Sequence, residues 1–363
     1  MEAGRAEAGR TGASPARTGM REMPAAAPSG DVPSDALQRV SVRELDRMLV
    51  EIANLPDAQM SERLATLELT ERLSAGPLAD MIARLRGRES QRVLAALAAA
   101  SAFSDPPAED IPAMAEPDRA ARREILSRAI EHSSALTASP PSYAAHRTLV
   151  RFDDAGRNRG GEGCGWRVTG VDSGAVQVRR GKPSEWMRRT AAGVDESLDV
   201  SGADVSILGT VFLDAMDARN RFEWSRWESG PAGPLAVFRF AIREDTSHYR
   251  VEYCCIADGR AVRIFRATPA YHGEMAIDPA SGAVLRVTMI ADLKPGDPMA
   301  ASNLMVEFAP VAINGKTSMC LTKTISVSRV RLGATLREGP DATQDAPERT
   351  MLSESTFDSF RPL

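Results

Sequence analysis

The chain has few of the side chains on which catalysis and metal binding most often depend. Its 363 residues include only four histidines and four cysteines. None of the histidines stands in an H-E-x-x-H pattern, and no C-x-x-C motif occurs. Gly315-Lys316-Thr317 matches the last three residues of the phosphate-binding loop motif, but Pro310 stands where that motif requires its first glycine. We therefore expect no catalytic residues, no metal site and no cofactor; a hydrolase whose site is assembled from distant residues is an alternative.

Long apolar runs are also lacking. The small-apolar run from Ala95 to Ala100 is far shorter than the roughly 18–20 residues that span a bilayer, so we expect no transmembrane segment. The first twenty residues lack the apolar segment of a secretory signal. This favours a cytoplasmic protein, unless the true N-terminus lies elsewhere. The net charge of −4, with basic residues spread along the chain, argues against nucleic acid as a partner.

Composition and periodicity divide the chain into five parts. The first is rich in Ala, Gly, Pro and Arg and has too few large apolar side chains to fold, so we expect it to be disordered. The third holds four prolines and four acidic residues, which is typical of an extended linker. The predicted parts are a disordered segment (1–38), a helical region (39–104), a linker (105–117), a helix followed by antiparallel β-structure (118–332), and a tail (333–363) with a final strand near 351–361.

The helical region carries local signals for helix ends. Ser41 followed by Glu44 is a capping box, in which the two side chains satisfy backbone groups of the first turn. A second helix is expected to begin at Ser61 and to carry Leu67 and Leu73 on its apolar stripe. Two further helices are expected to begin at Pro77 and near Glu89.

After Pro140 the apolar period changes from that of a helix to that of a strand. Short turns join the predicted strands, so consecutive strands are expected to be antiparallel neighbours, including those over 248–256 and 262–267. Asp258-Gly259 and Asn314-Gly315 suit two-residue hairpins, and Asp278 to Gly282 suits a turn that ends on a left-handed glycine.

Alternation along these strands predicts one apolar and one water-facing side. Helices over 118–132 and 204–217 are the natural covers of the apolar side. The predicted fold class is α+β: at least eight antiparallel strands in one strongly curved sheet, a half-barrel covered by helices and preceded by the small helical region.

Aromatic side chains gather on two neighbouring predicted strands. Phe222 and Trp224 share one strand face, as do Phe238 and Phe240. An ordinary core is one interpretation. The other is the lining of an apolar pocket between the sheet and its helices. The candidate ligand-binding residues are Phe222, Trp224, Phe238, Phe240, Val287 and Met289.

The state of the cysteines depends on the cell compartment, because disulfides are typical of exported proteins and rare in cytoplasmic ones. Cys254 and Cys255 are consecutive on a predicted strand, so their side chains point to opposite faces. Cys254 continues the polar side, and Cys320 shares a face with the polar Lys316 and Thr322. If a disulfide forms, this parity pairs Cys254 with Cys320; buried free thiols are the alternative expected in a cytoplasmic protein.

Several stretches resemble known families. A helix followed by a strand meander with a hairpin at 273–288 resembles the half-barrel proteins of the bacterial envelope, which include periplasmic lipoprotein carriers and sigma-E regulator proteins. An uncharacterised family of acidobacterial proteins is similar over longer segments. These are LELTERLS (67–74), SAFSDPP (101–107), GPLAVFRF (233–240), SHYRVEYCC (247–255) and the hairpin itself.

The resemblance implies a non-enzymatic, exported or periplasmic protein that binds an apolar ligand, such as a lipid or the acyl chain of a lipoprotein. The alternative is a structural or protein-interaction module with a filled core, in which residues 39–104 dock a protein partner. An open apolar cavity favours the first interpretation and a filled one favours the second.

Overall fold

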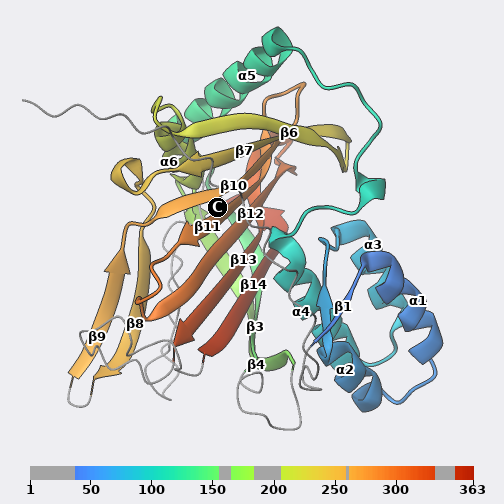
Figure 1. Cartoon of the computed structure of the whole chain (residues 1–363). Helices are drawn as coiled ribbons and strands as arrows, with labels where there is room; N and C mark the ends of the chain where they lie inside the picture. The colour runs from blue at the N-terminus through green and yellow to red at the C-terminus, as the bar shows by residue number, and fades with distance from the viewer. Residues whose placement is uncertain (1–36, 155–164, 184–205, 259–260, 332–347) are drawn as a thin grey trace, which may run out of the picture. The chain divides into compact units, whose positions relative to one another are not determined.

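The computed structural model describes residues 37–154, 165–183, 206–258, 261–331 and 348–363. Residues 1–36, most of the segment expected to be disordered, lie outside this description. Six α-helices lie in the described part of the chain (Figure 1). They are α1 (Val42–Ile52), α2 (Asp57–Ala65), α3 (Ala75–Arg84), α4 (Arg88–Ala100), α5 (Arg119–Ala138) and α6 (Ser206–Ala215).

The helical region follows the predicted helix ends with one exception. The capping box at Ser41 is confirmed, because its side chain accepts from the Glu44 backbone N–H while the Glu44 carboxylate accepts from Ser41. The bounds predicted for the second helix were wrong. It begins at Asp57 and ends at Ala65, and the next residues form a short strand, β2 (Leu67–Leu69), parallel to β1 (Gln38–Val40). Leu67 and Leu69 are both buried, as alternation along a strand requires.

In the described part of the chain, ten strands form one antiparallel sheet, so the prediction of at least eight is confirmed. Its order is β5-β4-β3-β14-β13-β12-β11-β10-β7-β6, and β5 and β6 are its two edges. Strand direction rotates strongly from β3 and β4 to β6 and β7 (Figure 1). The strands are β3 (Tyr143–Asp153), β4 (Arg167–Arg179), β5 (Lys182–Pro183), β6 (Arg221–Gly230), β7 (Gly233–Ile242), β10 (Ala270–Ile277), β11 (Val284–Asp292), β12 (Met299–Ile313), β13 (Lys316–Arg331) and β14 (Glu348–Arg361).

Two strands expected in this sheet form a separate ribbon. β8 (Val251–Asp258) and β9 (Ala261–Ala267) pair only with each other among the described strands. The place that β8 would take beside β7 belongs to β10, which pairs with β7 from Tyr271↔Ile242 to Ile277↔Ala236. A simple meander is therefore the wrong description between residues 248 and 267.

The C-terminal strand is internal to the sheet. β14, at the place where the sequence indicates a final strand, pairs with β13 on one side and with β3 on the other. Residues 37–363 form one compact unit. The predicted linker is tied to the sheet, since the Trp227 Nε1 atom donates to the Ala115 carbonyl at 2.8 Å.

The turns follow the predicted chemistry where they are described. Asn314 and Gly315 have φ angles of 51° and 74°, as a type I′ hairpin requires, and Gly282 is left-handed with φ of 74°. Gly259, in the other predicted hairpin turn, lies outside the described residues.

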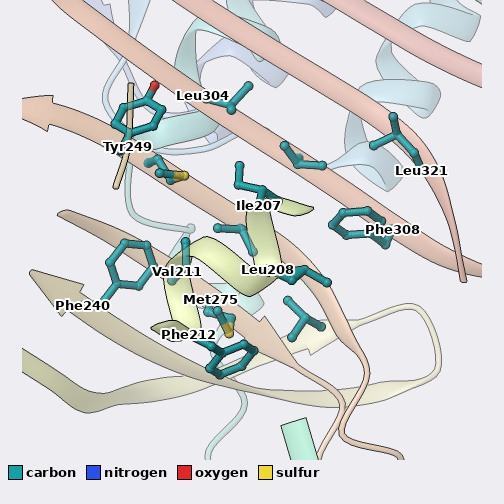
Figure 2. Packing of buried hydrophobic residues seen from close by; sticks show 14 of the residues in the cluster. Ile207, Leu208, Val211, Phe212, Phe240, Tyr249, Met275, Leu304, Phe308 and Leu321 are labelled. Atoms are coloured by element: carbon teal, nitrogen blue, oxygen red, sulfur yellow. The ribbon is translucent and has the colours of Figure 1, made fainter. Parts of the chain in front are cut away.

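Helices α5 and α6 cover one face of the sheet, as predicted. Figure 2 shows Ile207, Leu208, Val211 and Phe212 of α6 packed against sheet side chains such as Met275. From α5, Ile125 and Ala129 join the same buried cluster. α5 continues to Ala138, six residues beyond the predicted end at His132.

The opposite face is also covered, which corrects the prediction of a water-facing side. Residues of the helical region form a second buried cluster with sheet side chains of that face, and α4 packs against β14 and β4. The sheet residues in this cluster are Phe152, Met305, Ile325 and Leu352, with Trp166 just before β4. The helical region therefore docks onto its own sheet.

Candidate functional site

The six residues predicted to line a pocket are packed against one another and their neighbours. Phe238, Phe240, Val287 and Met289 are each at most 2% exposed, and Phe222 and Trp224 are partly buried. The Phe222 ring stacks on Phe238 and Phe240, with centroids 5.6 and 6.5 Å apart. Trp224 meets Phe238 edge-on at 5.5 Å. At these positions the filled-core interpretation describes the molecule.

An apolar groove lies elsewhere, where the end of α5 meets three turns of the sheet. Its volume is about 1460 Å³. The turns are those between β6 and β7, between β10 and β11, and between β12 and β13. The apolar lining consists of Ala135, Leu136, Pro140, Pro141, Pro231, Ala232, Pro234, Leu235, Pro279, Ala280, Ala283, Leu285, Ala309, Pro310, Ile313, Met319 and Pro362.

The wall formed by the β10–β11 turn is held tightly. Asp278 accepts from the Ala280 backbone N–H at 3.0 Å and from the Ser281 hydroxyl at 2.5 Å. Arg128 of α5 donates to the Pro279 carbonyl at 2.8 Å. These bonds use the carboxylate of Asp278 within its own turn, so the groove presents mainly apolar surface and few charges. Such a surface suits a ligand with a long apolar part.

The other sheet face carries a network of buried ion pairs. Glu228, with a side chain only 4% exposed, accepts from Arg72, Arg226 and Arg286 at 2.5, 3.1 and 2.8 Å. Arg226 also holds Glu274 in a bidentate pair, with both distances 2.6 Å. Alternation along these strands predicts a water-facing side, but the structure buries these polar side chains in ion pairs with one another.

The buried carboxylate of Asp214 fastens α6 to its surroundings. It accepts from the Tyr271 hydroxyl at 2.8 Å, from the His248 backbone N–H at 3.0 Å and from the His248 ring. Burial, together with the hydrogen bond to Asp214, raises the pKa of Tyr271. Sequence reasoning missed this group because its members stand far apart in the chain. Their arrangement joins the covering helix α6, the loop that carries His248, and the internal strand β10.

The structure decides between the two alternatives given for Cys320, a disulfide with Cys254 and a buried free thiol, in favour of the free thiol. The Cys320 thiol is free and 0% exposed, packed among core side chains of β13 rather than on a polar face. A register shift between Glu307 and Phe308 of the neighbouring strand changes the alternation near this residue. The bridge to Cys254 is therefore absent; the side chain of Cys254 lies outside the description.

The described residues contain no group of three or more His, Cys, Asp or Glu side chains placed to hold a metal ion. None of the helices in the described part of the chain combines the length and apolar character needed to cross a bilayer. Comparisons with protein-family models, with curated proteins and with solved structures found no match.

Proposed function

We propose that this protein is a non-enzymatic binding protein that holds the acyl chain of a lipid or lipoprotein in the apolar groove. The observation that carries the proposal is the groove itself, about 1460 Å³ and lined mainly by Leu, Ile, Met, Ala and Pro side chains. Pockets for compact small molecules are roughly 300–1,000 Å³. A larger, open groove better suits a long or branched apolar ligand.

The energetics favour a ligand with more than one chain. Burial stabilises by roughly 0.8 kcal/mol per CH₂ group, so about 14 buried groups would contribute about 11 kcal/mol. The loss of translational and rotational freedom on binding is estimated at about 4–15 kcal/mol. A single chain that is partly exposed in an open groove should therefore bind weakly. A lipid or lipoprotein with two or three chains should bind more tightly.

The same proposal includes two further points: the sheet is a half-barrel, and the protein is exported. Among the described strands, the sheet is antiparallel and its edge strands β5 and β6 do not pair with each other, as expected of a half-barrel. An exported carrier would meet lipoproteins in the bacterial envelope, as the resemblance of the 273–288 hairpin suggests. The proposal differs from the sequence-based expectation in the place of the ligand, which moves from the aromatic core to the groove at the sheet's turns.

A second candidate is a structural or interaction module without a ligand. It is favoured by the aromatic cluster, where Phe238 and Phe240 fill the expected pocket. Residues 39–104 are less available for a protein partner than expected, because they cover the sheet.

Native mass spectrometry of protein purified from its own cells separates the two candidates. The binding proposal predicts a co-purified species with the mass of an acylated molecule, released by organic solvent. The module without a ligand predicts the mass of the bare chain under the same conditions. Protein that has been stripped with solvent and then incubated with a diacyl phospholipid provides the control for loss of ligand during purification.

A further inference from the structure

A second cavity, of about 410 Å³, lies beside the network of buried ion pairs. Strands β6, β7, β10 and β11 form one wall, and residues 102–105, which follow α4, form the other. Arg72, Arg239 and Glu274 of the ionic network line it, together with the exposed pair Arg221 and Glu223. Its lining has no residue in common with that of the apolar groove.

Arg72 is the unusual member of this lining. Its side chain is only 7% exposed, and its backbone N–H donates to the Asp105 carbonyl at 2.8 Å, which places it against the cavity wall. Among the described residues, its guanidinium has one side-chain partner, Glu228, bound through the Nη2 atom. A guanidinium has five N–H donors, so most of its hydrogen-bonding capacity is unused.

The charges around the cavity do not balance. Among the buried groups of the network, Arg72, Arg226 and Arg286 face two carboxylates, Glu228 and Glu274, which leaves one positive charge. Arg239, Asp105 and the pair of His272 with Asp292 are about half-exposed or more. Asp105 is 75% exposed, so it compensates less than the two buried carboxylates do. Arg221 and Glu223 cancel. Burial, and then the repulsion from Arg286, lower the pKa of Arg72, as expected for a cation with too few anions around it.

We propose that this cavity binds a small molecule bearing an oxyanion, a carboxylate or a phosphate, with the Arg72 guanidinium as its main donor. The planar fork of arginine fits two oxygens of either group at once. An anion placed there supplies the missing negative charge and takes the unused N–H groups. The volume fits a small metabolite rather than a polymer. This site is independent of the proposed acyl-chain groove.

The test is isothermal titration of the full-length protein with inorganic phosphate and, separately, with succinate, in buffer of constant ionic strength. Two variants probe the site. Arg72→Gln removes the donor, and Ala241→Leu fills the cavity from its exposed rim without removing any member of the ionic network. Arg250→Gln, an exposed arginine outside the cavity, is the control for overall charge.

We expect saturable binding of phosphate or succinate by the unmodified protein, at least tenfold weaker in Arg72→Gln and Ala241→Leu and unchanged in Arg250→Gln. The anion that binds more tightly identifies the ligand as a phosphate or a carboxylate. If Arg72→Gln does not fold, Ala241→Leu decides alone. Absence of binding of both anions by the unmodified protein, or equal binding by Ala241→Leu, overturns the proposal.

Discussion

The Nη2 atom of Arg72 lies 2.5 Å from the Oε1 atom of Glu228, and both side chains are more than 90% buried. The pair joins the loop after β2 to the edge strand β6, so an ionic contact as well as apolar packing fastens the helical region to the sheet. Burial alone would raise the pKa of Glu228. The hydrogen bonds and charges of Arg286 and Arg72 outweigh this effect and lower the pKa to about 2.

The first prediction concerns pH. Because the pKa of Glu228 is lower in the folded protein than its ordinary value of 4.5, its contribution to stability is fully present above about pH 4.5 and is lost as the pH falls toward 2. A shift of this size corresponds to about 3 kcal/mol at neutral pH. Glu228→Gln should therefore lower the free energy of unfolding by about 3–5 kcal/mol at pH 7.

Urea denaturation of both proteins between pH 7 and pH 2.5 provides the measurement. The difference between them should shrink below about pH 4.5. A difference that stays constant over the whole range would mean that Glu228 is not an ionised partner of the arginines.

A second prediction compares two glycines with the same left-handed φ of 74°. A Cβ at Gly315 would meet open space, whereas one at Gly282 would lie 2.5 Å from the backbone carbonyl carbon of Arg128. Gly315→Ala should cost about 1 kcal/mol, from backbone strain alone. Gly282→Ala should cost about 3 kcal/mol, because α5 must also move away from the β10–β11 turn. Equal losses of unfolding free energy in chemical denaturation would contradict the close contact between turn and helix.

A third prediction separates the aromatic core from the groove. Trp224 contacts Trp227 and Phe238, with ring centroids 5.0 and 5.5 Å away. Trp224→Ala should lower the free energy of unfolding by about 3 kcal/mol and leave the affinity for lipid unchanged at temperatures where the variant is folded. Trp224→Phe, which keeps a ring, is the control. If Trp224→Ala lost lipid binding without losing stability, the aromatic cluster rather than the groove would be the binding site.

The fourth prediction concerns Cys320. Burial raises the pKa of its thiol to about 11. In a variant with Cys164, Cys254 and Cys255 replaced by Ser, the remaining thiol should react negligibly with a disulfide reagent at pH 8 while the protein is folded. It should react completely in denaturant. Rapid reaction of the folded protein would show that this part of β13 is accessible.

Local features of the fold could be predicted from the sequence because their causes are local. The capping box at Ser41 and the left-handed positions at Gly282 and Gly315 each depend on a few neighbouring residues. Leu67 and Leu73 were misassigned because leucines at those spacings fit a helical stripe, whereas β1 makes 67–69 a strand by pairing with it.

Long-range features could not be predicted in this way. No short pattern indicates that β14 inserts between β3 and β13, or that β10 displaces β8 from β7. Arg286 and Glu274 alternate with apolar residues as solvent-facing side chains do, and only their partners, Arg226 and Glu228, explain their burial. The groove was missed because separate turns and the end of α5 build it, and none of them carries a ligand-binding motif.

The central claim is that the groove binds an acyl chain, and a blocking variant tests it most directly. Ala135 and Ala138 are both exposed on α5, but only Ala135 lines the groove. A tryptophan at position 135 should therefore fill the groove, while one at 138 should leave it open. The measurement is equilibrium binding of a fluorescent diacyl phospholipid, below its aggregation concentration, to the unmodified protein, Ala135→Trp and Ala138→Trp. We predict saturable binding that is at least tenfold weaker in Ala135→Trp and unchanged in Ala138→Trp. Absence of binding by the unmodified protein, or equal affinity in all three proteins, would contradict the account.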